Sequence, residues 1–472
     1  MRPNYKPAAL ALAAALVLGG CAGFSKDSGF DSVRTAVQER TGAAPRWARS
    51  DQDAAEIRAT VARTLSSGAL TADGAVQIAL INNPGLQATY AELGIAEADL
   101  VQAGRMRNPG YSFGRSTRGG EIEIERAFIV DVLGLLAIPL RTQIERRRFA
   151  LAKTRVSAEA TRVAGDARRA HHAAVAAHES VKYMRDVQAA ADASADLARR
   201  MAAVGNLSRL DQAREQLFYA ETTAQLARVM QASLSERESL TRLMGLQGED
   251  LAFRLPDRLP DLPKAARDVA DLEAVALKQR LDVQAAMQDA ESLASSLGLT
   301  RATGFVSVLE FAYRNKSESG MPRQNGYEIE LRLPIFDWGE ARVARAERTY
   351  MQAVSRAAEV AARARSEVRE SYNAYRTAYD LARHYREEIV PLSKRISDEN
   401  VLRYNGMLLS VFELLADARQ QIAAVNAYIE TLRDYWIAES TLHMAMTGIS
   451  PGVMAAPASA QAASGAGARA GH

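Results

Sequence analysis

The segment Tyr327–Ala346 constrains the fold of this chain more than any other feature, because it joins a strand pattern directly to a long helix pattern. Charged and apolar residues alternate over Glu328–Ile335, as in a strand with one wet face and one apolar face. A helix follows, with Asp337 as its predicted N-cap and Glu340 three residues later. The helical pattern continues for about sixty residues, a length on the order of 100 Å. The molecule must therefore pass from a sheet into a long helix at this point.

The chain repeats one order of elements twice. The segment Ala79–Ala88 corresponds to Ala276–Ala285, an offset of 197 residues. Residues 71–255 and residues 267–448 each predict two shorter helices, a strand pair and two long helices separated by a glycine turn. Residues 256–266 contain three prolines and are a predicted linker. The strand pairs are predicted at 111–130 and 305–335, and the long helices at 141–204, 208–244, 338–404 and 407–446.

Three positions indicate where these helices begin, bend or end. The largely apolar run Phe128–Leu140 is compatible with a longer strand or with a collar buried at membrane level, and Pro139 lies near the change to helix. Pro391 lies inside the predicted helix 338–404 and predicts a kink there. Gly245 is the predicted end of the helix 208–244.

The N-terminus carries a secretory signal over residues 1–20, with two basic residues before a short apolar stretch. Leu18–Cys21 resembles a bacterial lipobox, in which the peptide is cut before Cys21 and the cysteine receives acyl chains. A plain signal peptide with an incidental cysteine is the alternative. Lipoproteins held in the inner membrane usually have Asp after the lipidated cysteine, so Ala22 is typical of a lipoprotein sorted to the outer membrane. Residues 21–70 are expected to be a lipidated, irregular lead-in, and residues 449–472 a disordered tail rich in Ala, Ser and Gly.

Composition excludes several classes of protein. The net charge is +3 with 24% charged residues, so nothing indicates a nucleic-acid partner. One cysteine among 472 residues excludes an internal disulfide and makes a cysteine-based metal site implausible. The sequence has no nucleophile–base set, no glycine-rich phosphate loop and no zinc-ligand spacing. We therefore expect a protein that is not an enzyme, with no metal and no cofactor besides the covalent lipid on Cys21.

The four predicted strands have one apolar face and one charged face. Four strands cannot close a barrel, and an open sheet edge cannot lie in lipid because its backbone groups would lack partners. Two chains would give an eight-stranded barrel filled by side chains, and three would give twelve strands around an aqueous bore. A small soluble sheet capping a coiled coil is the alternative. The apolar outer face comprises Ile122, Ile124, Phe305, Leu309, Phe311, Ile329 and Leu331, and the barrel lumen would receive Glu121, Glu123, Glu328, Glu330 and Arg332.

The combined pattern resembles the TolC family of outer-membrane efflux channels over about residues 70–448. The resemblance rests on the lipobox, Asn83–Leu86, Leu333–Gly339 and the two turns Val204–Asp211 and Tyr404–Leu415. It implies an α+β membrane protein: a homotrimeric β-barrel in outer-membrane lipid, continued by a long α-helical coiled-coil barrel into the periplasm. It also implies a periplasmic adaptor protein and an inner-membrane pump as partners. Small molecules or metal ions would pass through this passive duct unchanged.

The resemblance also assigns roles to single residues. The adaptor would dock at two helical tips, formed by Gly205, Asn206, Asn405 and Gly406. Acidic residues would narrow the periplasmic entrance, and the candidates are Asp211, Glu413 and Asp417, with Arg209 as an ion-pair partner; ordinary solvated helix surface is the alternative. The seam between barrel and helices would lie at the membrane interface and consist of Pro334, Phe336, Asp337, Trp338 and Gly339.

Two other functions are compatible with the pattern. One is a structural coiled-coil lipoprotein, tethered to the outer membrane by Cys21 and without a pore. The other is a channel for type I protein secretion. Within one predicted helix, His171 and His178 share a face, which is compatible with a metal relay, although a solvated or tunnel-lining position is the simpler interpretation.

Overall fold

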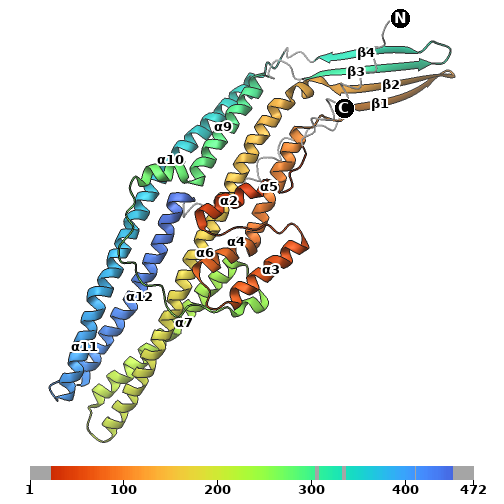
Figure 1. The fold of residues 1–472 in the computed structure, drawn as a ribbon. Coiled ribbons are helices and arrows are strands. Elements are labelled where there is room, and N and C mark those ends of the chain that lie inside the picture. Colours follow the sequence, from red (N-terminus) through yellow and green to blue (C-terminus); the bar gives the residue numbers. More distant parts are fainter. Residues whose placement is uncertain (1–22, 303–307, 332–335, 410, 450–472) are drawn as a thin grey trace.

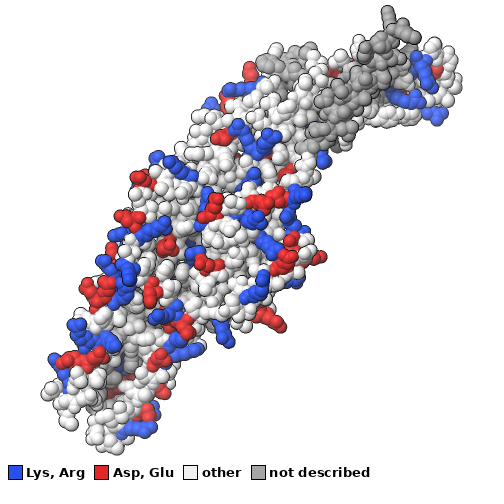
Figure 2. Space-filling view, viewed as in Figure 1, with Lys and Arg blue, Asp and Glu red and all other residues white. Residues whose placement is uncertain are grey.

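The computed structural model describes residues 23–302, 308–331, 336–409 and 411–449. The molecule is elongated: a sheet lies at one end, two long helical hairpins extend to the other, and shorter helices pack around the middle (Figure 1). Among the described residues, no helix combines the length and the apolar character needed to cross a membrane. Lys, Arg, Asp and Glu are interspersed along the visible helical surface (Figure 2).

All the described strands belong to one antiparallel sheet with the order β1-β2-β3-β4. Each copy of the duplication supplies one hairpin, and pairing of β2 with β3 joins the two copies. The predicted four strands in two hairpins are thereby confirmed. The strands are β1 Gly110–Arg118, β2 Glu121–Asp131, β3 Leu309–Glu318 and β4 Gln324–Leu331.

The two hairpin loops differ in length. Gly119 and Gly120 have φ of 61° and 95° and form a two-residue turn, for which positive φ at both positions is required. The second loop is shorter than the polar segment Lys316–Asn325 predicted from composition, because pairing of Lys316 with Gln324 extends the ladder into that segment. The polar composition of this segment therefore led to an overestimate of the length of the loop.

The first long helix, α6 Val132–Ala203, begins directly after β2. The apolar run Phe128–Leu140 is thus divided between strand and helix, and Pro139 lies inside α6 rather than before it. Asp131 explains the position of the boundary, because its Oδ1 accepts a hydrogen bond of 2.6 Å from the backbone N–H of Gly134. The prediction that α6 starts at Arg141 was therefore too late.

The second helix of the first hairpin, α7 Arg209–Met244, begins one residue after the predicted start and ends at the predicted residue. Ser208 caps its start by accepting a hydrogen bond from the Asp211 backbone N–H, and Gly245 ends it with φ 66°. The left-handed conformation at Gly245 is the one that commonly terminates helices. Ser208 and Gly245 therefore mark the two ends of α7.

The second pair of long helices is interrupted near Pro391, as predicted. It comprises α10 Glu340–His384, the π-helical turn η2 Tyr385–Ile389, α11 Val390–Asn405 and α12 Val411–Thr447. The proline ring lacks an N–H and crowds the preceding turn, so the widened turn just before Pro391 is the expected response.

The predicted N-cap of α10 was wrong. Gly339, with φ 80°, occupies the N-cap position, and no side chain caps this helix end. Asp337 instead accepts a hydrogen bond of 2.8 Å from the Gly339 backbone N–H. A residue in the left-handed conformation at the junction favours glycine, so the chain turns at Gly339 and the helix starts at Glu340.

The irregular structure predicted for the lead-in at residues 21–70 was also wrong within its described part. This region contains α2 Phe30–Thr41 and α3 Asp51–Ser66. Phe30, Val33 and Val37 lie on one face of α2 and are buried in the core with α5 and α6. The i, i+3, i+7 spacing of these residues, and the capping box formed by Ser50 and Asp53, are signals that predict both helices.

The middle of the molecule surrounds α6 with helices from both copies. The first copy contributes α4 Ala72–Asn82 and α5 Pro84–Ala103, and the second contributes α8 Leu272–Gln279 and α9 Leu281–Ala302. Between them lies the short 3₁₀ helix η1 Gly248–Ala252. Arg280, at the α8–α9 junction, is fully buried and forms ion pairs with Asp282 and with Glu367 of α10. A buried charge of this kind requires such partners.

Candidate functional site: the sheet faces and the helical tips

The strand register places every carboxylate of the described sheet on one face. Residues directly opposite each other in an antiparallel ladder project to the same side. Glu123 lies opposite Glu318, and Glu310 lies opposite Glu330, so the carboxylates of both hairpins project from the same face of the sheet. This charged face carries Glu121, Glu123, Glu125, Asp131, Glu310, Glu318, Glu328 and Glu330.

Ion pairs cross the charged face between strands. Lys316 pairs with Glu123, and Arg314 pairs with Glu328. Four of the five residues predicted to line a lumen therefore share this face, and the fifth, Arg332, lies outside the described residues. The arrangement is a wet, polar surface with more carboxylates than cations.

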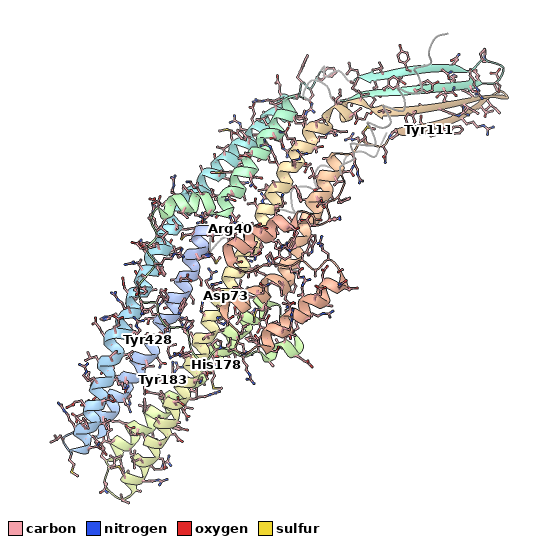
Figure 3. The ribbon with its side chains drawn as sticks, in the orientation of Figure 1. Arg40, Asp73, Tyr111, His178, Tyr183 and Tyr428 are labelled. Carbon is pink, nitrogen blue, oxygen red and sulfur yellow. The ribbon has the colours of Figure 1, made fainter. Side chains whose placement is uncertain are left out.

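The opposite face is apolar and contains a row of aromatic side chains, one from each strand. Tyr111 lies opposite Phe128, Phe128 opposite Tyr313, and Tyr313 opposite Tyr327. All four are exposed, Tyr327 to 76%. Figure 3 labels Tyr111 on β1, in the sheet beyond the helical part of the molecule.

Further apolar rows lie on the helix side of the aromatic row. Val130, Phe311 and Ile329 form one row, and Leu309 and Leu331 the next. Of the predicted apolar residues, Phe305 alone lies outside the described part of the chain. No other described element of the chain covers this face, and an exposed apolar surface of this kind marks a membrane or a protein interface.

The two seams between sheet and helices are built differently. In the second copy Phe336 is 99% exposed and Trp338 is 58% exposed, next to the turn at Gly339; Pro334 lies outside the described residues. In the first copy Asp131 caps the helix, and the exposed apolar side chains follow on α6 itself, at Leu135, Leu136 and Leu140. Each seam thus presents apolar side chains beside the sheet.

Both helical tips lie at the end of the molecule remote from the sheet (Figure 1). The first turns at Gly205, which has φ 80°, and the second turns after Gly406 at Met407, which has φ 61°. The tips expose apolar side chains: Val204 is 72% exposed and Met407 94%.

The acidic candidate of the first tip is held by its own helix. Ser208 Oγ donates a hydrogen bond of 2.6 Å to Asp211 Oδ2, and Arg214 Nη1 lies 3.1 Å from Asp211 Oδ1. Arg214, rather than Arg209, is therefore the ion-pair partner of Asp211 in the described structure. Within the part of the chain that the structure describes, Arg209 forms no ion pair.

The acidic candidates of the second tip lie in different surroundings. Glu413 is exposed in the first turn of α12. Asp417 accepts a hydrogen bond from Asn400 of α11, so it joins the two helices of this hairpin. Asp211 and Glu413 thus occupy corresponding first turns in the two copies, whereas Asp417 has a partner across the hairpin.

An ion pair between a buried carboxylate and a partly exposed arginine, which the sequence did not indicate, links the two helical hairpins. Glu215 of α7 is 3% exposed, accepts a hydrogen bond of 2.9 Å from Ser194 Oγ, and lies 3.4 Å from Arg419 Nη2 of α12. The Arg419 guanidinium carbon lies 4.1 Å from the centre of the Phe218 ring. No local spacing predicts a pair separated by 204 residues in sequence.

His171 and His172 of α6 are buried rather than solvated, whereas His178 is half-buried. His171 Nε2 lies 2.7 Å from the carbonyl oxygen of Leu70. His172 stacks on Trp436 with ring centres 5.4 Å apart, and burial lowers its pKa to about 3. The described residues contain no group of three or more His, Cys, Asp or Glu side chains that could hold a metal ion.

The chain matches no protein-family model and no curated protein in sequence. Its fold is nevertheless shared by solved outer-membrane proteins. The Campylobacter jejuni CmeC outer membrane channel has a TM-score of 0.70 at 16% identity, over 81% of this chain and 87% of CmeC. The outer membrane protein VceC from Vibrio cholerae has a TM-score of 0.66 at 15% identity, over 84% of this chain and 96% of VceC.

A third similar structure is the open state of the Neisseria gonorrhoeae MtrE outer membrane channel. Its TM-score is 0.67 at 14% identity, over 79% of this chain and 88% of MtrE. The resemblance to TolC-family channels is therefore confirmed for the fold. A four-stranded sheet with segregated faces, continued by paired long helices, is the fold that this chain shares with the solved outer-membrane channels.

Proposed function

We propose that this chain is the outer-membrane channel of a tripartite efflux system, a passive duct through which substrate leaves the periplasm. The segregation of all described strand carboxylates to one face, with exposed aromatic residues on the other, carries this proposal. A transmembrane barrel needs this arrangement, because one face contacts lipid and the other lines water. The similar outer-membrane channels support the same interpretation.

The channel would be a homotrimer. The described sheet has two edge strands, β1 and β4, each with one unpaired ladder edge. Backbone groups cannot remain unpaired in lipid, so the β1 edge of one copy must pair with the β4 edge of the next. Three copies give twelve strands and an aqueous bore, into which Glu121, Glu123, Glu328, Glu330 and Arg332 would project.

The helical end would be the periplasmic entrance. In this proposal Asp211, Glu413 and Asp417 narrow the opening, and a periplasmic adaptor protein docks at the tips around Gly205–Asn206 and Asn405–Gly406. The exposed apolar side chains at both tips support docking, because such patches are typical of protein interfaces. An inner-membrane pump would supply the substrate, which would be a small molecule or a metal ion.

The protein would be held in the outer membrane both by its barrel and by acyl chains on Cys21. The decisive experiment is expression of wild-type protein and a Cys21→Ala variant that carries a conventional cleavable signal peptide. We expect trimers in outer-membrane fractions for both proteins, and discrete single-channel currents in planar bilayers. A structural lipoprotein without a pore predicts release of the Cys21→Ala protein into the periplasm and no conductance. That result would refute the channel.

A further inference from the structure

The apolar face of the sheet is charged at only two positions within the described strands, and both residues are arginines. Arg115 lies on β1 and Arg126 on β2. Each described carboxylate of the sheet lies on the opposite face. The charged face carries both basic and acidic residues, so the strands as a whole are not poor in carboxylates. The absence of carboxylates from the apolar face is therefore not a consequence of composition. Both charged residues of the apolar face are therefore positive, and electrostatic attraction on this face favours anions.

Arg126 belongs to a polar row that crosses three strands. Its Nη1 donates a hydrogen bond of 3.1 Å to Asn315 Oδ1, and Asn315 Nδ2 donates one of 2.6 Å to Asn325 Oδ1. The register aligns these three residues directly, with Phe113 opposite Arg126 on β1. An ordered polar row on an otherwise apolar face marks a change of environment at this level.

The polar row interrupts the apolar surface on the side remote from the helices, and Ile124 and Ile122 lie beyond it on the same face. It lies two residues along each strand from the aromatic row that contains Tyr111 and Tyr327, on the side of the hairpin loops (Figure 1). Aromatic residues mark the boundary between hydrocarbon and headgroups in membrane barrels. The two arginines would therefore lie at headgroup level in the leaflet farther from the periplasm.

The arginines are placed to act on one ligand group. Arg115 lies opposite Ile124 and Arg126 opposite Phe113, so the two are diagonal neighbours on adjacent strands. Diagonal positions are about 7–8 Å apart, within reach of two long side chains that converge on one tetrahedral anion. Arg115 is exposed and has no hydrogen bond or ion pair within the described residues, and Arg126 keeps donors beyond the one used on Asn315.

We propose that Arg115 and Arg126 form a binding site for a phosphate group of the phosphorylated glycolipid of the outer leaflet. The site rests on the proposed function, since it requires the sheet to cross the outer membrane with its helices in the periplasm. Guanidinium groups bind phosphate oxygens through paired, charge-assisted hydrogen bonds. The carboxylate-free surface avoids repulsion of the same phosphate, and the neighbouring aromatic row would contact the acyl chains.

The test measures binding of fluorescent lipid A to the full-length trimer in detergent by fluorescence anisotropy. The variants are Arg115→Gln, Arg126→Gln and the double variant; glutamine at 126 keeps an amide donor for Asn315. We expect about tenfold weaker binding in the double variant, since hydrogen bonds to charged groups contribute this much or more. Lysine at both positions should restore part of the affinity.

The matched control is Arg314→Gln, which removes one positive charge from the opposite face of the same sheet. It should bind lipid A like the wild type. Unlabelled lipid A should displace the probe, whereas dephosphorylated lipid A and inorganic phosphate at equal concentration should not. Unchanged binding in the double variant, an equal loss in Arg314→Gln, or displacement by inorganic phosphate would each overturn the site.

The same preparations separate this proposal from the proposed function. Trimer formation and single-channel conductance are measured for the wild type and for the double variant. If the wild type conducts and the double variant binds lipid A equally well, the channel function is supported and the lipid site is refuted. If the wild type neither trimerises nor conducts, the proposed channel function is refuted, whatever its affinity for lipid A.

Discussion

At the residue scale, two glycines with the same backbone conformation have different surroundings. Gly205 and Gly245 both have positive φ. A Cβ added at Gly205 would meet no atom within 4 Å, whereas one at Gly245 would lie 2.6 Å from the backbone oxygen of Asn82. Asn82 is itself tied to this turn, because its Nδ2 donates hydrogen bonds to the carbonyl oxygens of Met244 and Gly245. The two turns should therefore respond differently to the same substitution.

We expect Gly205→Ala to destabilise the protein by about 1 kcal/mol, the cost of a left-handed non-glycine residue. Gly245→Ala should cost about 1–3 kcal/mol more, because the backbone of Asn82 must move. Thermal unfolding of both variants in detergent is the measurement. Equal melting temperatures for the two variants would show that the contact with Asn82 does not constrain the turn.

The buried His172 gives a pH dependence whose sign follows from its surroundings. Burial lowers its pKa from 6.5 to about 3, so between these values the unfolded chain binds a proton that the folded chain does not. Stability contributed by this group is complete above pH 6.5 and is lost as the pH falls. Burial also lowers the pKa of His171 and His443, so these two groups likewise reduce stability as the pH falls. Burial raises the pKa of Glu439, so this group instead reduces stability as the pH rises.

Replacing His172 by phenylalanine keeps an aromatic ring against Trp436 and removes the titration. From pH 6.5 to pH 5, His172 accounts for a loss of about 2 kcal/mol, at about 1.4 kcal/mol per pH unit. The melting temperature of His172→Phe should therefore fall less over this range than that of the wild type. Parallel pH profiles for the two proteins would contradict this account.

At the scale of the elements, the two helical hairpins are joined by the Glu215–Arg419 pair. Arg419→Met would leave the buried Glu215 carboxylate with Ser194 as its remaining hydrogen-bond donor among the described residues and should cost about 1–3 kcal/mol. Glu215→Leu with Arg419→Met should cost less than the sum of the single changes, because neither leaves the other's charge uncompensated. Arg214→Met breaks the exposed pair with Asp211 and should change stability by less than about 0.5 kcal/mol.

The Glu215–Arg419 pair also shows why some features could be predicted from the sequence and others could not. Strand alternation, the caps at Ser208 and Gly245 and the interruption at Pro391 depend on neighbouring residues, so local patterns predict them. The burial of Glu215 depends on a partner from the other copy of the duplication, which no local pattern contains. The N-cap of α10 was misassigned for a related reason: Asp337 and Gly339 are both residue types that occur at N-caps, and the backbone conformation at Gly339 decides between them.

At the scale of the whole molecule, the charged face of the sheet determines which ions the proposed bore would favour. Glu123 and Glu328 are offset by Lys316 and Arg314, whereas Glu121 and Glu125 form no ion pair within the described residues. Three copies would place an excess of carboxylates around the bore, and such rings favour cations.

The channel should therefore be cation-selective, and the double change Glu121→Gln and Glu125→Gln should shift the reversal potential in a salt gradient toward zero. The preference should weaken at high salt, because screening shortens the range of the carboxylate field to about 3 Å at 1 M. Asp51→Asn on α3 removes an exposed carboxylate from a helix near the middle of the molecule and should leave the potential unchanged. Anion selectivity in the wild type would mean that the charged face of the sheet does not line the conducting path.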